Sequence, residues 1–297
     1  MIGAFASAPA LERRSAMDPG FLPYRDRACL RLLYRCDVAT TAQLTTLVYR
    51  RRQTAQERLS ALFHIGYLDR AVLPPSSRGG APLAFRVSAM ARRRLGYLSL
   101  TRFRAGTQLR HSLNVVETIC ALVRATPPSD EPLVQLWHPE YNAADLLPGV
   151  YPDSVVVLQA PRGSAVLCLE IDEGTEHGPQ IRDKLARYGN AIGGRPPWQV
   201  VFVAPSRERV DFIARVAKRD GGSPVLDGRA WALVLGELSG HGLGTTLVPL
   251  FLGGQRYALA ELVGDPAPRR CPTPVGTDAW LHVLGYGGTE EIDEALR

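Results

Sequence analysis

The chain has 297 residues, of which 45% are hydrophobic and 22% charged, so it is long enough for one large or two ordinary packed domains. No segment approaches the roughly 18 uninterrupted apolar residues of a membrane span, and the N-terminus lacks the basic start and long apolar centre of a signal peptide. The five cysteines include no C-x-x-C pair, which speaks against a structural zinc site. These features predict a globular cytoplasmic protein without a membrane partner.

The net charge of +6 is unevenly distributed along the chain. Residues 24–104 hold sixteen Arg and no Lys against four acidic residues, a formal charge of +12, whereas residues 105–297 carry −6. A basic part beside an acidic part indicates that the first binds a polyanion and that the second has another role. The alternative is an arginine-rich surface that is merely solvated.

Three short helices and a strand hairpin are predicted in the basic part from apolar spacing and turn residues. In chain order these elements are a helix from Tyr24 to near Asp37, helices over Ala42–Tyr49 and from Thr54 to Gly66, a strand Tyr67–Leu73, a turn Pro74–Pro82, a strand Leu83–Ser88 and a helix Ala89–Tyr97. Thr40 or Thr41 can cap the second helix. Thr54-Ala-Gln-Glu57 has the spacing of a capping box, which predicts the start of the third.

Three helices followed by a hairpin are typical of a winged helix-turn-helix, and the stretch Gln56–Arg70 resembles the recognition helix and first wing strand of that family. Recognition helices enter the major groove of DNA by their N-terminal end. Side chains suited to phosphate and base-edge contacts stand at this end, and one arginine stands at the predicted wing tip. These candidate DNA-binding residues are Arg50, Arg51, Arg52, Gln53, Gln56 and Arg78. Such modules also bind proteins, so a protein contact is the alternative.

The acidic part reads as a helix, several strands, a helix, a strand and a helix, which predicts an α/β domain with a mixed sheet and an α+β fold for the whole chain. The predicted elements are helix Leu109–Arg124, strands Leu133–Trp137, Ser154–Gln159 and Ala165–Ile171, helix Pro179–Ala191, strand Trp198–Ala204, helix Arg207–Arg219, and strands Trp231–Gly236 and Thr246–Leu252. We therefore expect an N-terminal arm (1–23), a winged-helix domain (24–104), a linker near 101–108, an α/β domain (109–262) and a C-terminal tail (263–297).

Three acidic residues are expected to meet at one end of the central hairpin. A turn near Arg162 places Glu170 opposite about residue 155, which brings it close to Asp153. Asp172 lies two residues further and so points to the same face of the strand. Two or three carboxylates with waters suit Mg²⁺ or Mn²⁺. The alternative is a solvated strand end, although a free carboxylate after the apolar run before Glu170 would be costly.

Pro152-Asp153 followed by Glu170-Ile-Asp172 after a hairpin resembles the Pro-Asp…(Asp/Glu)-x-Lys signature of PD-(D/E)XK nucleases, which are restriction-endonuclease-like. The resemblance implies that Asp153, Glu170 and Asp172 bind the metal and that the site cleaves DNA. Asp172 stands where the signature has a lysine, so Lys184 on the next helix is the candidate substitute. Glu117 matches an additional acid of many such nucleases, with a surface glutamate as the alternative. Tyr188 is read as a core residue rather than a nucleophile.

A longer pattern, Leu-Glu170-Ile-Asp-Glu-Gly-Thr-Glu176 with Lys184-Leu-Ala-Arg-Tyr188 and the upstream His111–Glu117, resembles the replication-relaxation family over roughly residues 24–220. That family is similar to MobC-type relaxases of mobile plasmids. The resemblance implies a protein that binds, and nicks, double-stranded DNA at the origin of a plasmid or integrative element, together with other conjugation or replication proteins. A cleavage-silent regulator of plasmid replication or transcription, and a scaffold that recruits transfer proteins, stay open as alternatives.

Overall fold

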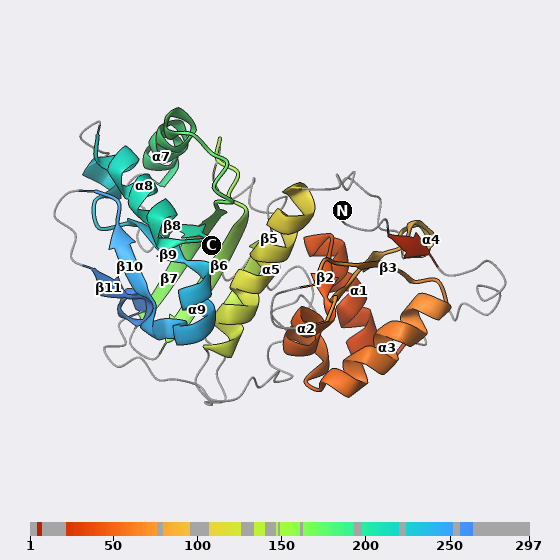
Figure 1. Cartoon of the computed structure of the whole chain (residues 1–297). Helices are drawn as coiled ribbons and strands as arrows, with labels where there is room; N and C mark the ends of the chain where they lie inside the picture. The colour runs from red at the N-terminus through yellow and green to blue at the C-terminus, as the bar shows by residue number, and fades with distance from the viewer. Residues whose placement is uncertain are drawn as a thin grey trace. The chain divides into compact units, whose positions relative to one another are not determined.

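The computed structural model describes residues 5–7, 22–75, 80–95, 107–125, 134–139, 147, 149–160, 163–192, 198–219, 224–251 and 256–263 (Figure 1). The described residues fall into two compact units, which divide between Glu117 and Thr118. Both units mix helices with strands, so the predicted α+β composition is confirmed at this level. No helix among the described residues is long and apolar enough to cross a membrane.

The first unit begins with the predicted series of helices. Their bounds are α1 Tyr24–Cys36, α2 Thr41–Leu44, the π-helical turn η3 Thr45–Tyr49 and α3 Arg52–His64. Thr40 caps α2 in a capping box with Gln43, whose backbone N–H donates to the Thr40 hydroxyl. The capping box predicted at Thr54 is wrong, because α3 already begins at Arg52 and its N-cap residue, Arg51, makes no side-chain cap.

A four-stranded sheet in the order β1-β3-β4-β2 completes this unit within the described residues. Its antiparallel strands are β1 Ala6–Ser7, β2 Ala39–Thr40, β3 Leu68–Val72 and β4 Leu83–Val87. The β3–β4 hairpin was predicted, whereas β1 lies in the segment expected to be an arm. Ser7 Oγ donates to Asp69 Oδ1 over 2.6 Å and so ties β1 to β3. Helix α4, Ala89–Arg94, follows the hairpin.

A buried carboxylate connects α1 with the two segments that follow it. Asp26 is fully buried and accepts hydrogen bonds from the Tyr49 hydroxyl, at 3.1 Å, and from the Arg58 guanidinium. Arg58 forms an ion pair with this carboxylate. Because Tyr49 ends η3 and Arg58 stands in α3, Asp26 fixes both relative to α1.

Helix α5, Thr107–Arg124, contributes its first turns to the first unit. Leu109 is buried with Val38, Leu73 and Ala84. Gln43 Nε2 donates to the backbone carbonyl of Leu113 over 2.9 Å. The predicted boundary near 101–108 therefore differs from the observed division, because these contacts group α5 up to Glu117 with the basic unit.

The second unit contains a mixed sheet in the order β11-β10-β9-β8-β7-β6-β5. Its strands are β5 Val134–Pro139, β6 Ser154–Ala160, β7 Gly163–Ile171, β8 Trp198–Ala204, β9 Ala230–Val234, β10 Thr246–Pro249 and β11 Tyr257–Ala258. Strands β7, β8 and β9 are parallel and the other neighbours are antiparallel. The predicted mixed sheet is confirmed. The segment predicted as strand up to Gly236 instead passes into helix α9, Leu235–His241, and Leu252 lies outside the described residues.

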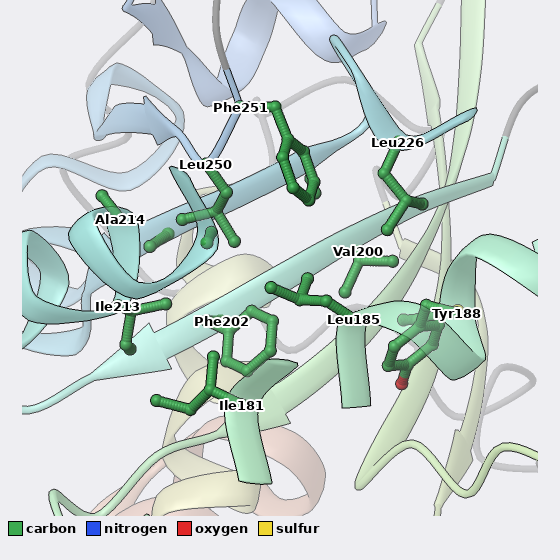
Figure 2. Packing of buried hydrophobic residues seen from close by; sticks show 14 of the residues in the cluster. Ile181, Leu185, Tyr188, Val200, Phe202, Ile213, Ala214, Leu226, Leu250 and Phe251 are labelled. Carbon is green, nitrogen blue, oxygen red and sulfur yellow. The ribbon is translucent and has the colours of Figure 1, made fainter. Parts of the chain in front are cut away.

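Helices α7, Gly178–Ile192, and α8, Arg207–Lys218, pack on one face of this sheet. Their apolar side chains meet alternate residues of β8, such as Val200 and Phe202, in one buried core (Figure 2). Glu170 of β7 has the same parity as Cys168, which belongs to this core. Its side chain therefore points toward the helices. The opposite face is also buried, and the 3-10 helix η6, Leu259–Val263, contacts β6 and β7 there.

Candidate active site

The β6–β7 hairpin brings Asp153 beside Glu170. The strands pair Ser154 with Leu169 and Ala160 with Gly163, so the connection is tight and Glu170 aligns with the residue before β6. The expected register, with Glu170 opposite about residue 155, is off by two positions because the chain reverses earlier, between Ala160 and Gly163. The expected proximity of Asp153 and Glu170 follows from the observed register. Asp153 Oδ2 accepts from the backbone N–H of Ile171 over 2.7 Å.

Glu170 is a buried carboxylate with only 2% of its surface exposed. Its Oε2 accepts a hydrogen bond from Lys184 Nζ at 2.7 Å, and its Oε1 accepts from the Tyr188 hydroxyl at 2.5 Å. Burial, followed by the charge of Asp153, raises the pKa of Glu170 to about 7, although Lys184 and Tyr188 act in the opposite direction. Two neighbouring carboxylates thus stand in a poorly solvated place, where cations would stabilise them.

Lys184 reaches this site from α7, one turn before Tyr188. Its ammonium group also donates to Glu176 Oε1 over 2.7 Å, so it lies between two carboxylates. Burial alone would lower the pKa of Lys184, but the charges of Glu170 and Glu176 and the hydrogen bonds to them raise it above its ordinary value. Lys184 is therefore a fixed cation. Tyr188 is fully buried, and the labelled side chain lies among the core residues of Figure 2.

Asp172 is held by an arginine. Arg209 of α8 donates from Nε to Asp172 Oδ1 at 2.8 Å and from Nη2 to Oδ2 at 2.7 Å, in a bidentate ion pair. The backbone N–H of Gly174 donates to the same Oδ1 at 2.6 Å. Within the described part of the chain, no three His, Cys, Asp or Glu side chains are grouped so that they could hold a metal ion. The predicted three-acid metal site is therefore corrected, because Asp172 turns to α8 while Glu170 turns to α7.

Glu117 of α5 was predicted to be an additional acid of this site. It belongs to the first unit, where Gln43 Nε2 donates to its Oε2 over 3.3 Å. Asp153 and Glu170 belong to the second unit. The role of Glu117 as an additional nuclease acid stays a prediction.

The predicted DNA-binding side chains lie together at the start of α3. Residues 50–53 and 56 are exposed, whereas Ala55, Leu59 and Leu62 of the same helix are buried. Arg50 adopts a positive φ of 64°, at the sharp change of direction between η3 and α3. Gln53 Nε2 donates to Glu57 Oε1 over 3.0 Å. Arg78, expected at the wing tip, lies outside the described residues.

Sequence reasoning missed Arg209 and included Glu176 only as part of the family pattern. Arg209 lies 37 residues after Asp172 and resembles any surface arginine near a helix start. The one usable signal was indirect: an acid that follows an apolar strand is buried, and a buried acid requires a cationic or hydrogen-bonding partner. Such reasoning predicts a partner without identifying it, since the sequence offers many arginines.

The whole chain was also compared with known proteins. No curated protein and no solved structure matches it. The family model described as replication-relaxation matches residues 30–201, which is more than half of the 297 residues. The matched range covers most of the first unit and continues through the acids of β7 and Lys184 to β8. The chain therefore belongs to the replication-relaxation family.

Proposed function

We propose that this protein binds double-stranded DNA at the origin of a plasmid or integrative element and nicks one strand with the help of Mg²⁺ or Mn²⁺. Family membership points to the replication or relaxation of mobile elements. Binding is assigned to the first unit, which we infer to be a winged helix. Cleavage is assigned to Asp153, Glu170 and Lys184 of the second unit.

The DNA-binding part of the proposal is supported by exposure and charge at the start of α3. Arg51 and Arg52 are exposed beside Gln53 and Gln56 at the N-terminal end of the helix, before the buried Leu59. Arginines suit phosphate oxygens, and glutamine amides suit the edge of adenine in the major groove. The helix rests on the Asp26 contacts, which would present this end as a rigid element.

One observation carries the cleavage part: Lys184 Nζ reaches Glu170 Oε2 from α7 at 2.7 Å. Acids and one lysine on a shared hairpin and helix have the residue types of the PD-(D/E)XK signature, with the lysine displaced from position 172. The cation that the signature requires is thereby supplied from another element. Without this contact the site would have no lysine, because Asp172 occupies the position of the signature lysine, and a nuclease function would lose its support.

The residues fit a divalent cation that is held by two protein carboxylates. Mg²⁺ commonly binds one or two carboxylates and completes its coordination with water and substrate phosphate. Glu170 and Glu176 share the ammonium group of Lys184, and Asp172 is paired with Arg209. Burial, followed by the charge of Asp153, raises the pKa of Glu170, and a cation held by these two carboxylates would relieve their repulsion.

In the proposed reaction, Asp153 and Glu170 hold the cation at the end of β7. When bound, the cation lowers the pKa of a coordinated water and stabilises the charge of the phosphate in the transition state. Lys184 orients the attacking water or contacts the scissile phosphate with its ammonium group. Tyr188 keeps the Glu170 carboxylate in place from the buried side.

Nicking of a supercoiled plasmid that carries the origin of the same element tests this function. We expect conversion to the open circle with Mg²⁺ or Mn²⁺ and none with chelator. Glu170→Gln and Lys184→Met should abolish or strongly slow nicking while DNA affinity stays near wild type. Glu237→Gln is the matched control, because Glu237 pairs with Arg207 in the same unit but outside this network. Wild-type protein that gives no metal-dependent open circle would contradict the proposed cleavage.

A second candidate function, a cleavage-silent DNA-binding regulator, is favoured by Asp172. An acid occupies the signature lysine position and is neutralised by Arg209, as in a purely structural ion pair. Origin binding without nicking, unchanged in Glu170→Gln, is the result that would select it.

A further inference from the structure

We propose that Asp172, Arg209 and Glu176 are positioning residues that hold the ammonium group of Lys184 against Glu170. The catalytic meaning of this inference rests on the proposed nuclease function, but the positioning itself concerns the folded protein alone. Asp172, which stands in the place of the signature lysine, would then act through other residues rather than as a ligand of the cation.

Arg209 connects the end of β7 to the loop that leads into α7. Its guanidinium holds both oxygens of Asp172, and its Nη2 also donates to the backbone carbonyl of Glu176 at 2.6 Å. The Asp172 side chain is 1% exposed and that of Arg209 is 14% exposed. A planar guanidinium can make such contacts at fixed angles, which a lysine ammonium cannot. The loop between Asp172 and Glu176 is therefore fastened at both ends by one side chain.

The loop geometry depends on a glycine between these two fastening points. Gly174 has a φ of +83°, a conformation that residues with a Cβ rarely adopt. This turn allows the Gly174 N–H to donate to Asp172 Oδ1 at 2.6 Å, while Arg209 Nη2 donates to the backbone carbonyl of Glu176. As a result, the backbone of Glu176 is placed next to α7.

Glu176 then transmits this placement to Lys184. Its Oε1 accepts from Lys184 Nζ at 2.7 Å, on the ammonium group that also donates to Glu170. Lysine has a long, flexible side chain, so two acceptors define its direction where one would leave it rotating. Hydrogen bonds thus connect Asp172 to Arg209, Arg209 to the backbone of Glu176, and the side chain of Glu176 to Lys184.

The two lysines of the chain, Lys184 and Lys218, allow a direct measurement. We would label the full-length protein with ¹³C,¹⁵N-lysine and record its side-chain spectrum without metal or DNA. In wild type we expect the ε-methylene protons of Lys184 to be inequivalent, as in an ordered side chain. Those of the exposed Lys218 should be equivalent and serve as an internal reference.

Arg209→Lys keeps the charge but loses the two parallel N–H donors of the guanidinium, and the third lysine signal that it adds is assigned separately from those of Lys184 and Lys218. We expect the Lys184 ε-methylene protons to become equivalent, with Lys218 unchanged. Arg207→Lys is the matched control on the same helix, since Arg207 pairs with Glu237, and it should leave Lys184 ordered. If Arg209→Lys does not fold, Glu176→Ala gives a second test, because the Glu176 side chain is 29% exposed and tolerates truncation better. An ordered Lys184 in both variants, or equal loss of order in Arg207→Lys, would overturn the inference.

Nicking kinetics separate this inference from the proposed function. If wild type nicks, Arg209→Lys should lower kcat by about 10- to 100-fold, the usual effect of residues that orient a metal site, with KM for DNA unchanged. A rise in KM for DNA with kcat unchanged would count against positioning. If wild type does not nick while Lys184 loses its order in Arg209→Lys as expected, the nuclease function fails and the positioning of Lys184 stands.

Discussion

At the scale of single residues, this protein buries acids where each finds a specific partner. Asp26, Glu170 and Asp172 are almost fully buried, and each accepts at least two hydrogen bonds from side chains or backbone. An unpaired buried carboxylate would be strongly destabilising, so these contacts are conditions for folding. The partners differ in kind, because Asp26 and Asp172 each bind an arginine whereas Glu170 binds Lys184.

Asp26 is the acid whose role is purely structural, and Asp26→Asn tests it. The amide has no charge, and its NH2 group replaces one of the two oxygens that accept from Arg58, so we expect a loss of about 2 kcal/mol in the free energy of unfolding, typical of hydrogen bonds to a charged group. Arg58 is partly exposed and can be solvated, which limits the loss. Chemical denaturation measures it, with the exposed Asp211→Asn as control within about 0.5 kcal/mol of wild type. Equal stability of both variants would contradict the assigned role.

At the scale of elements, periodicity predicted most helices and strands of the described part, and the exceptions have physical causes. The third helix begins at Arg52, before the expected cap at Thr54. Its buried residues hold it in place, so it needs no side-chain cap. The end of β9 passes into α9 although Leu235 and Gly236 read as strand, since an apolar pair is compatible with either state. Strand β1 was missed because two residues give no periodic signal.

The candidate site also contains residues that the sequence predicted and one pairing that it could not predict. Asp153, Glu170 and Lys184 were predicted from the motif and are brought together, since strand register and helix order follow from local sequence. The pairing of Asp172 with Arg209 could not be predicted, because it depends on how α8 packs against β7. Pairing between side chains far apart in the sequence therefore determines that Lys184 binds Glu170, whereas Asp172 binds Arg209.

The capping box found at Thr40 predicts a measurable element-scale effect. Its hydroxyl accepts from the Gln43 N–H, so Thr40→Ala should lower the free energy of unfolding by about 1 kcal/mol. Thr54→Ala is the matched control, because Thr54 stands inside α3 and makes no cap there. We expect it to lie within about 0.5 kcal/mol of wild type. Thermal or urea unfolding of both variants decides this, and a larger loss for Thr54→Ala would reverse the assignment of the helix starts.

At the scale of the whole molecule, formal charge differs between the two parts of the chain. The segment of formal charge +12 supplies the exposed start of α3, whereas in the second unit Glu170 and Asp172 are buried acids and the other described acids are half-buried or exposed. Each neutralised phosphate releases counterions and adds about −0.9 to the slope of log affinity against log salt. Binding of duplex DNA should therefore weaken steeply with salt.

Arg51→Ala with Arg52→Ala should reduce that slope by up to about 1.8, since two phosphate contacts are lost. Gln53→Ala or Gln56→Ala should change the preference among sequences more than the slope. Fluorescence anisotropy over a salt series, with specific and unrelated duplexes, measures both. An unchanged slope in the double arginine variant would mean that the start of α3 does not contact the phosphate backbone.

The last prediction concerns where the basic unit ends. The first turns of α5 bury Leu109 against Val38 and Ala84, and they satisfy the buried Gln43 through the Leu113 carbonyl. A fragment of residues 1–104 lacks both contacts. Exposing the apolar residues that Leu109 covers and leaving a buried amide without its acceptor each cost about 1–3 kcal/mol. We therefore expect residues 1–125 to unfold cooperatively at a clearly higher temperature than residues 1–104, by circular dichroism at equal concentration. Within the longer fragment, Leu109→Ala should lower the unfolding temperature toward that of the shorter one. Equal unfolding temperatures of the two fragments would instead favour a basic domain that is complete before α5, as the sequence alone predicts.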